Sequence, residues 1–81
     1  MKEVKIHLHS MDDIQGLVAV TAKIPERLDL MPLDDDETRV SGKSVVGIFS
    51  LDCFKPLRLR IHADGERVEE ICGQLKTFLI K

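Results

Sequence analysis

The sequence predicts one small domain of mixed α and β structure, because strand-like and helix-like segments alternate along a short chain. Its 81 residues allow a single hydrophobic core and no second domain. Apolar residues make up 43% of the chain and charged residues 32%, a balance typical of globular rather than disordered proteins. We therefore expect residues 1–81 to fold as one domain with the order strand, helix, strand, strand, short helix, strand, helix.

The N-terminal part predicts a strand followed by a helix. Apolar and polar residues alternate over residues 3–9, which is the two-residue period of a half-buried strand. Apolar positions with helical spacing then run from residue 14 to residue 22. We expect Asp12 or Asp13 to cap this helix and Pro25 to end it.

The rest of the chain predicts three more strands and a C-terminal helix. Residues 27–33 and 38–41 have the pattern of two short strands, joined by an acidic turn that lacks the ligand spacing of a calcium loop. Leucine and isoleucine alternate with arginine over residues 57–61, which is the clearest strand pattern in the chain. Residues 68–79 carry apolar side chains at helical spacing and predict the last helix.

The segment from Gly42 to Leu51 is short and apolar on nearly every side. If it is helical, Ile48 and Leu51 point in one direction and can face the sheet. A second apolar cluster is then left over, and exposed contiguous apolar surface on a soluble protein usually marks a binding site. That second cluster consists of Val45, Val46 and Phe49. We therefore predict that this segment is a protein-binding surface.

Ser44 occupies the predicted N-cap of this short helix, directly after Lys43. Serine is a favoured N-cap residue, so a purely structural cap is one interpretation. The other interpretation is a phosphorylation switch, in which a phosphate adds about −1.5 to −2 charges at the positive end of the helix dipole. The residues alone leave both interpretations open.

Several other functions have little support in the sequence. The net charge of −2 argues against nucleic-acid binding, and no apolar run has the length of a membrane span, so we expect a cytoplasmic protein. Cys53 and Cys72 are expected to be buried free thiols. His7, His9 and His62 could together bind a transition metal, but we favour a solvated sheet face. We expect no metal, no cofactor and no enzymatic activity, because no nucleophilic triad or phosphate-binding loop is visible.

The order of the elements and the string Gly42-Lys-Ser-Val-Val-Gly-Ile-Phe-Ser-Leu51 resemble the HPr family of bacterial phosphotransferase-system phosphocarriers. The resemblance covers almost the whole chain and is strongest from Gly42 to Gly65. It implies an α+β fold, the HPr-like open-faced β-sandwich, in which a four-stranded antiparallel sheet carries three helices on one face.

The resemblance also implies a regulatory role for Ser44. In many Gram-positive bacteria, the matching serine is phosphorylated by an HPr kinase, and the phosphorylated form is recognised by a transcription regulator of carbon catabolite repression. The resemblance implies that these partners share a surface made by Lys43, Val45, Val46 and Phe49.

One departure from the family concerns the catalytic histidine, which stands at the start of the first helix in a Gly-(Leu/Ile)-His-x-Arg-Pro-Ala pattern. Counting back from Ser44 without gaps places Asp13 at the histidine and Gln15 at the arginine. His9 lies four residues earlier and takes the histidine position only if the match contains a gap. A phosphorelay needs an imidazole and a nearby cation, so this chain resembles the regulatory Crh type, which lacks the histidine.

Three functions follow as alternatives. The first is a regulatory binding module that is phosphorylated on Ser44 and has no histidine phosphocarrier activity. The second is an interaction domain that keeps the HPr fold without any phosphorylation, and the third is a residual phosphocarrier. In each case we expect protein partners and a monomer or weak homodimer, with no nucleic acid or membrane as a partner.

Overall fold

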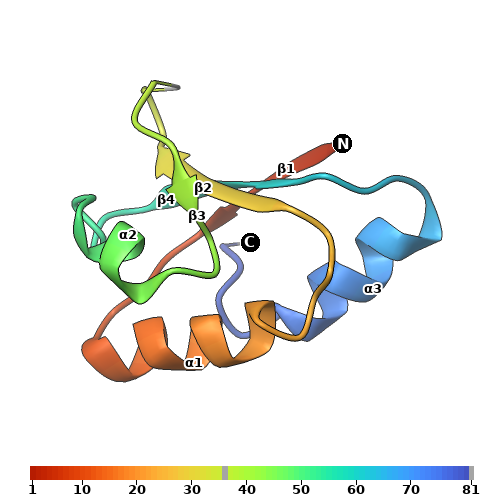
Figure 1. Cartoon of the computed structure of the whole chain (residues 1–81), viewed down its shortest axis with the longest axis horizontal. Helices are drawn as coiled ribbons and strands as arrows, with labels where there is room; N and C mark the ends of the chain where they lie inside the picture. The colour runs from red at the N-terminus through yellow and green to blue at the C-terminus, as the bar shows by residue number, and fades with distance from the viewer. Residues whose placement is uncertain (36, 81) are drawn as a thin grey trace.

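A computed structural model describes residues 1–35 and 37–80 of the chain (Figure 1). The elements follow one another in the order that the sequence predicts. They are β1 (Lys2–Ile6), α1 (Met11–Thr21), β2 (Leu28–Pro32), β3 (Val40–Ser41), α2 (Val45–Phe49), β4 (Leu57–Ile61) and α3 (Glu66–Gln74). Among the described residues, no helix has both the length and the apolar character needed to cross a membrane.

The four strands form one antiparallel sheet in the order β1-β4-β2-β3. Leu59 at the middle of β4 pairs with Val4 on one side and with Leu30 on the other. The helices lie on one side of this sheet, and the other side is left open (Figure 1). This arrangement confirms the predicted HPr-like open-faced β-sandwich.

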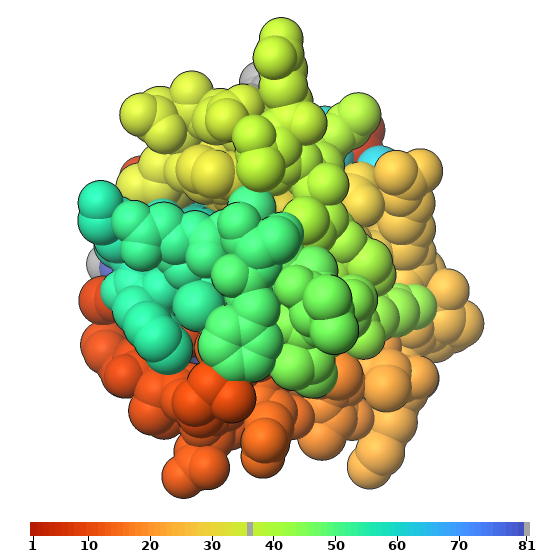
Figure 2. Space-filling model, turned by 60° about the vertical axis from the view of Figure 1, so that its left-hand side comes forward, coloured from red at the N-terminus to blue at the C-terminus, as the bar shows by residue number. Residues whose placement is uncertain are grey.

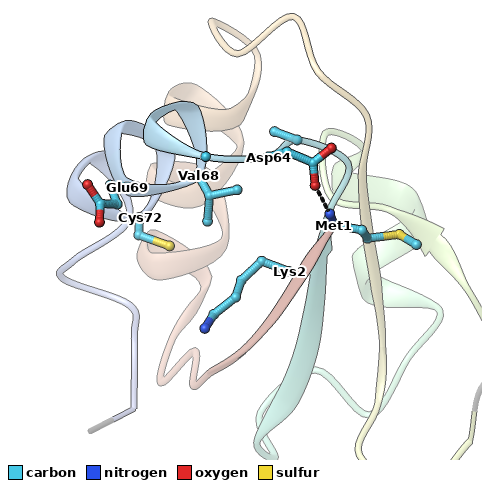
Figure 3. A pocket seen from close by; sticks show the side chains of 8 residues that line it. Met1, Lys2, Asp64, Val68, Glu69 and Cys72 are labelled. Atoms are coloured by element: carbon cyan, nitrogen blue, oxygen red, sulfur yellow. Dashed lines mark hydrogen bonds and ion pairs between the residues drawn. The ribbon is translucent and has the colours of Figure 1, made fainter.

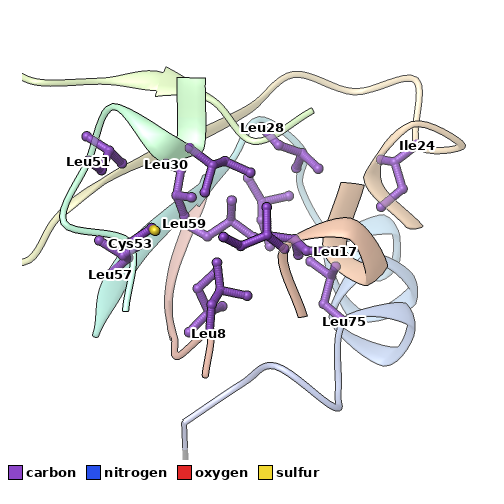
Figure 4. Close-up of a cluster of buried hydrophobic side chains, with 14 of the residues drawn as sticks. Leu8, Leu17, Ile24, Leu28, Leu30, Leu51, Cys53, Leu57, Leu59 and Leu75 are labelled. Carbon is purple, nitrogen blue, oxygen red and sulfur yellow. The ribbon is translucent and has the colours of Figure 1, made fainter. Parts of the chain in front are cut away.

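The hydrophobic core lies between the sheet and the helices (Figure 4). Strand β4 shows the predicted alternation, since its leucines and isoleucine are buried while Arg58 and Arg60 are only partly covered on the opposite face. Helix α1 contributes Ile14 and Leu17 to the core, and Ile71 from α3 is fully buried. The buried side chains of β4 thus pack in the same core as those of the helices.

The C-terminal segment differs from the prediction. Helix α3 ends at Gln74, so the predicted continuation through Leu79 is wrong. Leu79 instead forms a bridge with Ile6, and the Ile80 amide donates a hydrogen bond to the Lys5 carbonyl at 2.9 Å. The end of the chain thus covers the outer edge of β1 and uses backbone groups that an exposed edge strand would leave unpaired.

The ends of β1 and the start of α1 also differ from the predicted boundaries. Strand β1 ends at Ile6 rather than at His9, and Ile6 is the last residue that pairs with β4, opposite Leu57. Helix α1 begins at Met11, and its N-cap is Ser10 rather than an aspartate. Pairing with β4 stops at Leu57, the first residue of that strand, so the alternating pattern alone does not set the end of β1.

A buried carboxylate stands on the open face of the sheet. Asp29 on β2 accepts hydrogen bonds from His62 Nε2 at 2.8 Å and from Arg27 Nε at 3.1 Å. Burial tends to raise the pKa of the Asp29 carboxyl, but the hydrogen bonds from His62 and Arg27 outweigh this effect and hold the pKa below its usual value. The ionised carboxylate therefore stabilises the folded state.

Replacing Asp29 with asparagine should lower the free energy of unfolding at pH 7 by about 1–3 kcal/mol, because a buried charged acceptor is lost. The stabilisation by a carboxylate with a lowered pKa is present above the pKa of the unfolded chain and is lost as the pH falls through the folded pKa. Urea titrations from neutral to acidic pH should therefore show that Asp29→Asn and the wild type converge as the carboxylate is protonated.

The exposed Asp34 provides the matched control for this measurement. Asp34→Asn should change the free energy of unfolding at pH 7 by less than about 0.5 kcal/mol, as expected for a surface position. A constant difference between Asp29→Asn and the wild type across the acidic range would contradict the role assigned to the Asp29 carboxylate.

Candidate functional site

Ser44 is the N-cap of α2, as the sequence predicts. Its backbone is extended, with φ −113° and ψ 115°, and its Oγ accepts a hydrogen bond from the Gly47 amide at 3.0 Å. The side chain is half-buried. A Cβ added at Gly47 would lie 3.3 Å from Ser44 Oγ and 3.2 Å from Val40 Cβ. The absence of a side chain at Gly47 therefore provides the space that the Ser44 hydroxyl occupies.

The inward and outward sides of α2 are those that the sequence predicts, with one exception. Ile48 is fully buried and Leu51 is 7% exposed, so both belong to the core. Val46 is 81% exposed and Phe49 is 43% exposed. Val45, however, is half-buried and packs against the core, which makes the outward cluster smaller than predicted.

Two exposed apolar side chains outside α2 enlarge this surface. The end of α2 and the segment after it, green to turquoise in Figure 2, share one face of the molecule with the orange-red start of α1. Met11 at the start of α1 is 43% exposed, and Phe54 in the segment after α2 is 47% exposed. We call Met11, Val46, Phe49 and Phe54 the apolar surface. Periodicity within α2 could not find Met11 or Phe54, because both residues lie outside that helix.

Lys43 is tied to its own chain. Its ammonium group donates a hydrogen bond to the Ile24 carbonyl, just after α1, and the side chain is half-buried. Its positive charge also reaches Glu26, whose pKa is lowered mainly by a hydrogen bond from Arg67 and to a smaller extent by Lys43. Lys43 therefore connects the Ser44 segment to the end of α1 and does not extend freely into solvent.

Asp13, predicted at the position of the family's phosphorylated histidine, lies in the first turn of α1. Its amide donates to Ser10 Oγ at 3.3 Å, and its carboxylate accepts from the His9 amide at 2.8 Å. This exchange of side-chain and backbone hydrogen bonds closes the start of the helix, as in a capping box. Asp13 thus stabilises the start of α1. Its correspondence to the family's phosphorylated histidine stays a prediction.

His9 directly precedes Ser10, the N-cap of α1. Two acidic residues, Asp12 and Asp13, follow His9 in the first turn of α1.

The three histidines do not form a common metal site, so the alternative of a three-imidazole site is wrong. His7 and His9 have ring centroids 4.1 Å apart, and His7 Nε2 lies 2.9 Å from the Phe54 carbonyl. His62 follows β4 near the beginning of β1, whereas His7 follows the end of β1. Within residues 1–35 and 37–80, no group of three His, Cys, Asp or Glu side chains is placed to hold a metal ion.

A separate pocket of about 380 Å³ lies between the start of β1, the turn after β4 and α3 (Figure 3). An ion pair between the N-terminal ammonium group and Asp64 crosses its rim. Cys72 is half-buried in this pocket, while Cys53 is buried in the core, and both are free thiols. The residues lining the pocket are Met1, Lys2, Ala63, Asp64, Gly65, Val68, Glu69 and Cys72. None of them belongs to α2 or to the apolar surface.

The fold is similar to the crystal structure of HPr-C-His from Thermoanaerobacter tengcongensis. The TM-score is 0.67, the sequence identity is 23%, and the match covers 93% of this chain and 90% of that chain. No protein-family model matches the sequence, and no curated protein sequence is significantly similar to it. The comparison therefore shows an HPr-like fold.

Proposed function

We propose that this chain is an HPr-like regulatory module that binds other proteins through the apolar surface and is switched by phosphorylation of Ser44. The observation that carries the proposal is the placement of a half-buried serine hydroxyl two residues before Val46, the most exposed large apolar side chain of the described residues. A phosphate on Ser44 adds charge and strong acceptors beside an apolar contact area. A partner that binds both features distinguishes the two forms of the chain.

The chemistry of the switch requires no catalytic group from this chain. Ser44 Oγ attacks the γ-phosphorus of ATP on the kinase, a new O–P bond forms, ADP leaves, and the kinase accepts the hydroxyl proton. The hydroxyl already accepts a hydrogen bond from the Gly47 amide, and phosphate oxygens accept such bonds equally well. We therefore propose a substrate of an HPr kinase that is itself not an enzyme, with a transcription regulator of carbon metabolism as the reader.

Histidine phosphocarrier activity is not part of the proposal. Even if a gapped match gives His9 the histidine position, Asp13 directs its carboxylate at the His9 amide, and Asp12 adds a second acidic group in the first turn of α1. A phosphorylated imidazole carries negative charge and is stabilised by cations, whereas nearby carboxylates repel it. The start of α1 is therefore poorly suited to hold a phosphoryl group.

The proposal predicts one phosphate per chain after incubation with ATP and an HPr kinase, measured by intact-mass spectrometry. Ser44→Ala removes the only acceptor in the proposal and should abolish the product. Ser50→Ala is the matched control, because its hydroxyl lies at the other end of α2 and donates to the Gly47 carbonyl at 2.6 Å. Equal phosphate on wild type and Ser44→Ala, or none on wild type, would show that the proposal is wrong.

A binding module without phosphorylation is the second candidate, and the exposure of Val46 and Phe49 supports it independently of Ser44. Exposed apolar patches mark protein interfaces whether or not a modification site lies beside them. This candidate predicts no phosphate under any donor and loss of a copurifying partner on Phe49→Asp. A second copy of the chain is one such partner, and sedimentation across a concentration series shows whether a weak homodimer forms.

A further inference from the structure

Thr21, the last residue of α1, buries a hydroxyl group completely. Its Oγ1 lies 2.8 Å from the carbonyl oxygen of Gly42 and 3.3 Å from that of Val18 in the preceding turn of the helix. The contact with Gly42 joins segments that are 21 residues apart in the sequence. Because burying a hydroxyl is costly unless it is hydrogen-bonded, this side chain is suited to hold Gly42 rather than only to fill space.

Gly42 is held from its other side as well. Its amide donates to the Leu28 carbonyl at 2.8 Å, so both backbone polar groups of this residue have partners from other elements. A Cβ at this position would lie 3.3 Å from Leu28 Cβ and 3.3 Å from Leu59 Cδ1. The backbone of Gly42 is therefore pressed against β2 and β4 and clamped by Thr21.

Ser44 follows directly from this clamped residue. The peptide unit that Thr21 binds joins Gly42 to Lys43, whose ammonium group donates to the Ile24 carbonyl beyond the end of α1. The Ser44 amide donates to the Ser41 carbonyl at 3.2 Å, which closes a tight turn around Gly42 and Lys43. The direction in which Ser44 enters α2 thus depends on how the peptide after Gly42 is oriented.

We infer that Thr21 is a positioning residue for Ser44: it holds the Gly42–Ser44 turn in the conformation that a modifying kinase recognises. This inference rests on the proposed function of Ser44. Thr21 is fully buried and touches neither phosphate nor partner, so its effect passes through the Gly42 carbonyl. When the recognised conformation is only partly populated, apparent affinity falls in proportion to that population, whereas the reaction of the bound state is unchanged.

The test is the kinetics of Ser44 phosphorylation in Thr21→Val, which keeps the shape of the side chain and removes the donor. KM for the protein substrate should rise by up to about fivefold, the scale of one lost hydrogen bond, while kcat stays within about twofold. Thr21→Ser restores the hydroxyl and should restore KM. Ile71→Val in α3 is the control, because it weakens the core away from the turn and should leave KM unchanged.

Amide hydrogen exchange provides the second readout and needs no kinase. Loss of the clamp should speed exchange of the Gly47 amide, which is bonded to Ser44 Oγ, more in Thr21→Val than in Ile71→Val. If Thr21→Val does not fold, Thr21→Ala carries both measurements. A wild-type KM and wild-type exchange in the folded variant would overturn the inference and leave the proposed function intact, whereas an unphosphorylated wild type would overturn both.

Discussion

Replacing Phe49 with aspartate should weaken the binding of an HPr kinase to this chain by about a hundredfold, or about 3 kcal/mol. Aromatic side chains at the centre of an interface carry a large share of its binding energy, and an aspartate at this position places an unpaired charge against the partner. Phe49 is 43% exposed, so most of the loss should appear in binding rather than in folding. Titration calorimetry or surface plasmon resonance measures it.

Ile80→Asp is the matched control for this variant. Ile80 is 40% exposed, close to the exposure of Phe49, but it lies along β1 at the edge of the sheet opposite to β3, which precedes α2. Its substitution also creates a charge at an exposed apolar position, and we expect affinity within about twofold of the wild type, as for residues outside an interface. Equal losses for the two variants would show that apolar exposure in general, and not the surface around α2, decides binding.

Replacing Leu59 with alanine should lower the free energy of unfolding by about 2–5 kcal/mol. Leu59 is fully buried at the middle of β4, where the strand pairs with both β1 and β2. The loss combines two terms: the hydrophobic transfer free energy of the removed methyl groups, and the cost of a cavity that the neighbouring strands cannot close. Since a small domain has only about 5–15 kcal/mol of stability, urea denaturation should detect a large shift of the midpoint.

Leu33→Ala is the control for the Leu59 measurement, because Leu33 is 42% exposed on the connection after β2. It should cost less than about 1 kcal/mol, since little apolar area is buried there. If Leu59→Ala cost no more than Leu33→Ala, the assignment of β4 as the centre of the core would be wrong.

The fold was predictable where local pattern and tertiary structure agree. The alternation in β4 places Leu57 and Leu59 on the core side, as a two-residue period requires. The same pattern continues past Ile6 in β1, yet the strand stops there, where its pairing with β4 ends at Leu57. No pattern within β1 carries that information, since Leu57 is about fifty positions away in the sequence.

The site was predictable to a similar degree. Ser44 as N-cap and Val46 and Phe49 as outward side chains follow from residue type and helical spacing. The half-burial of Val45 and the hydrogen bond from Lys43 to the Ile24 carbonyl depend on how α2 and the end of α1 approach each other. Long-range contacts of this kind leave no periodic signal, and the buried hydroxyl of Thr21 is another example.

The direct test of the regulatory role is the intact mass of the wild-type chain after separate incubation with two donor systems. One contains ATP and an HPr kinase, and the other contains phosphoenolpyruvate and the enzyme that phosphorylates HPr. We expect one phosphate from ATP, lost in Ser44→Ala, and none from phosphoenolpyruvate. A phosphate from phosphoenolpyruvate that disappears in His9→Ala, with none from ATP, would contradict the regulatory role and identify a phosphocarrier instead.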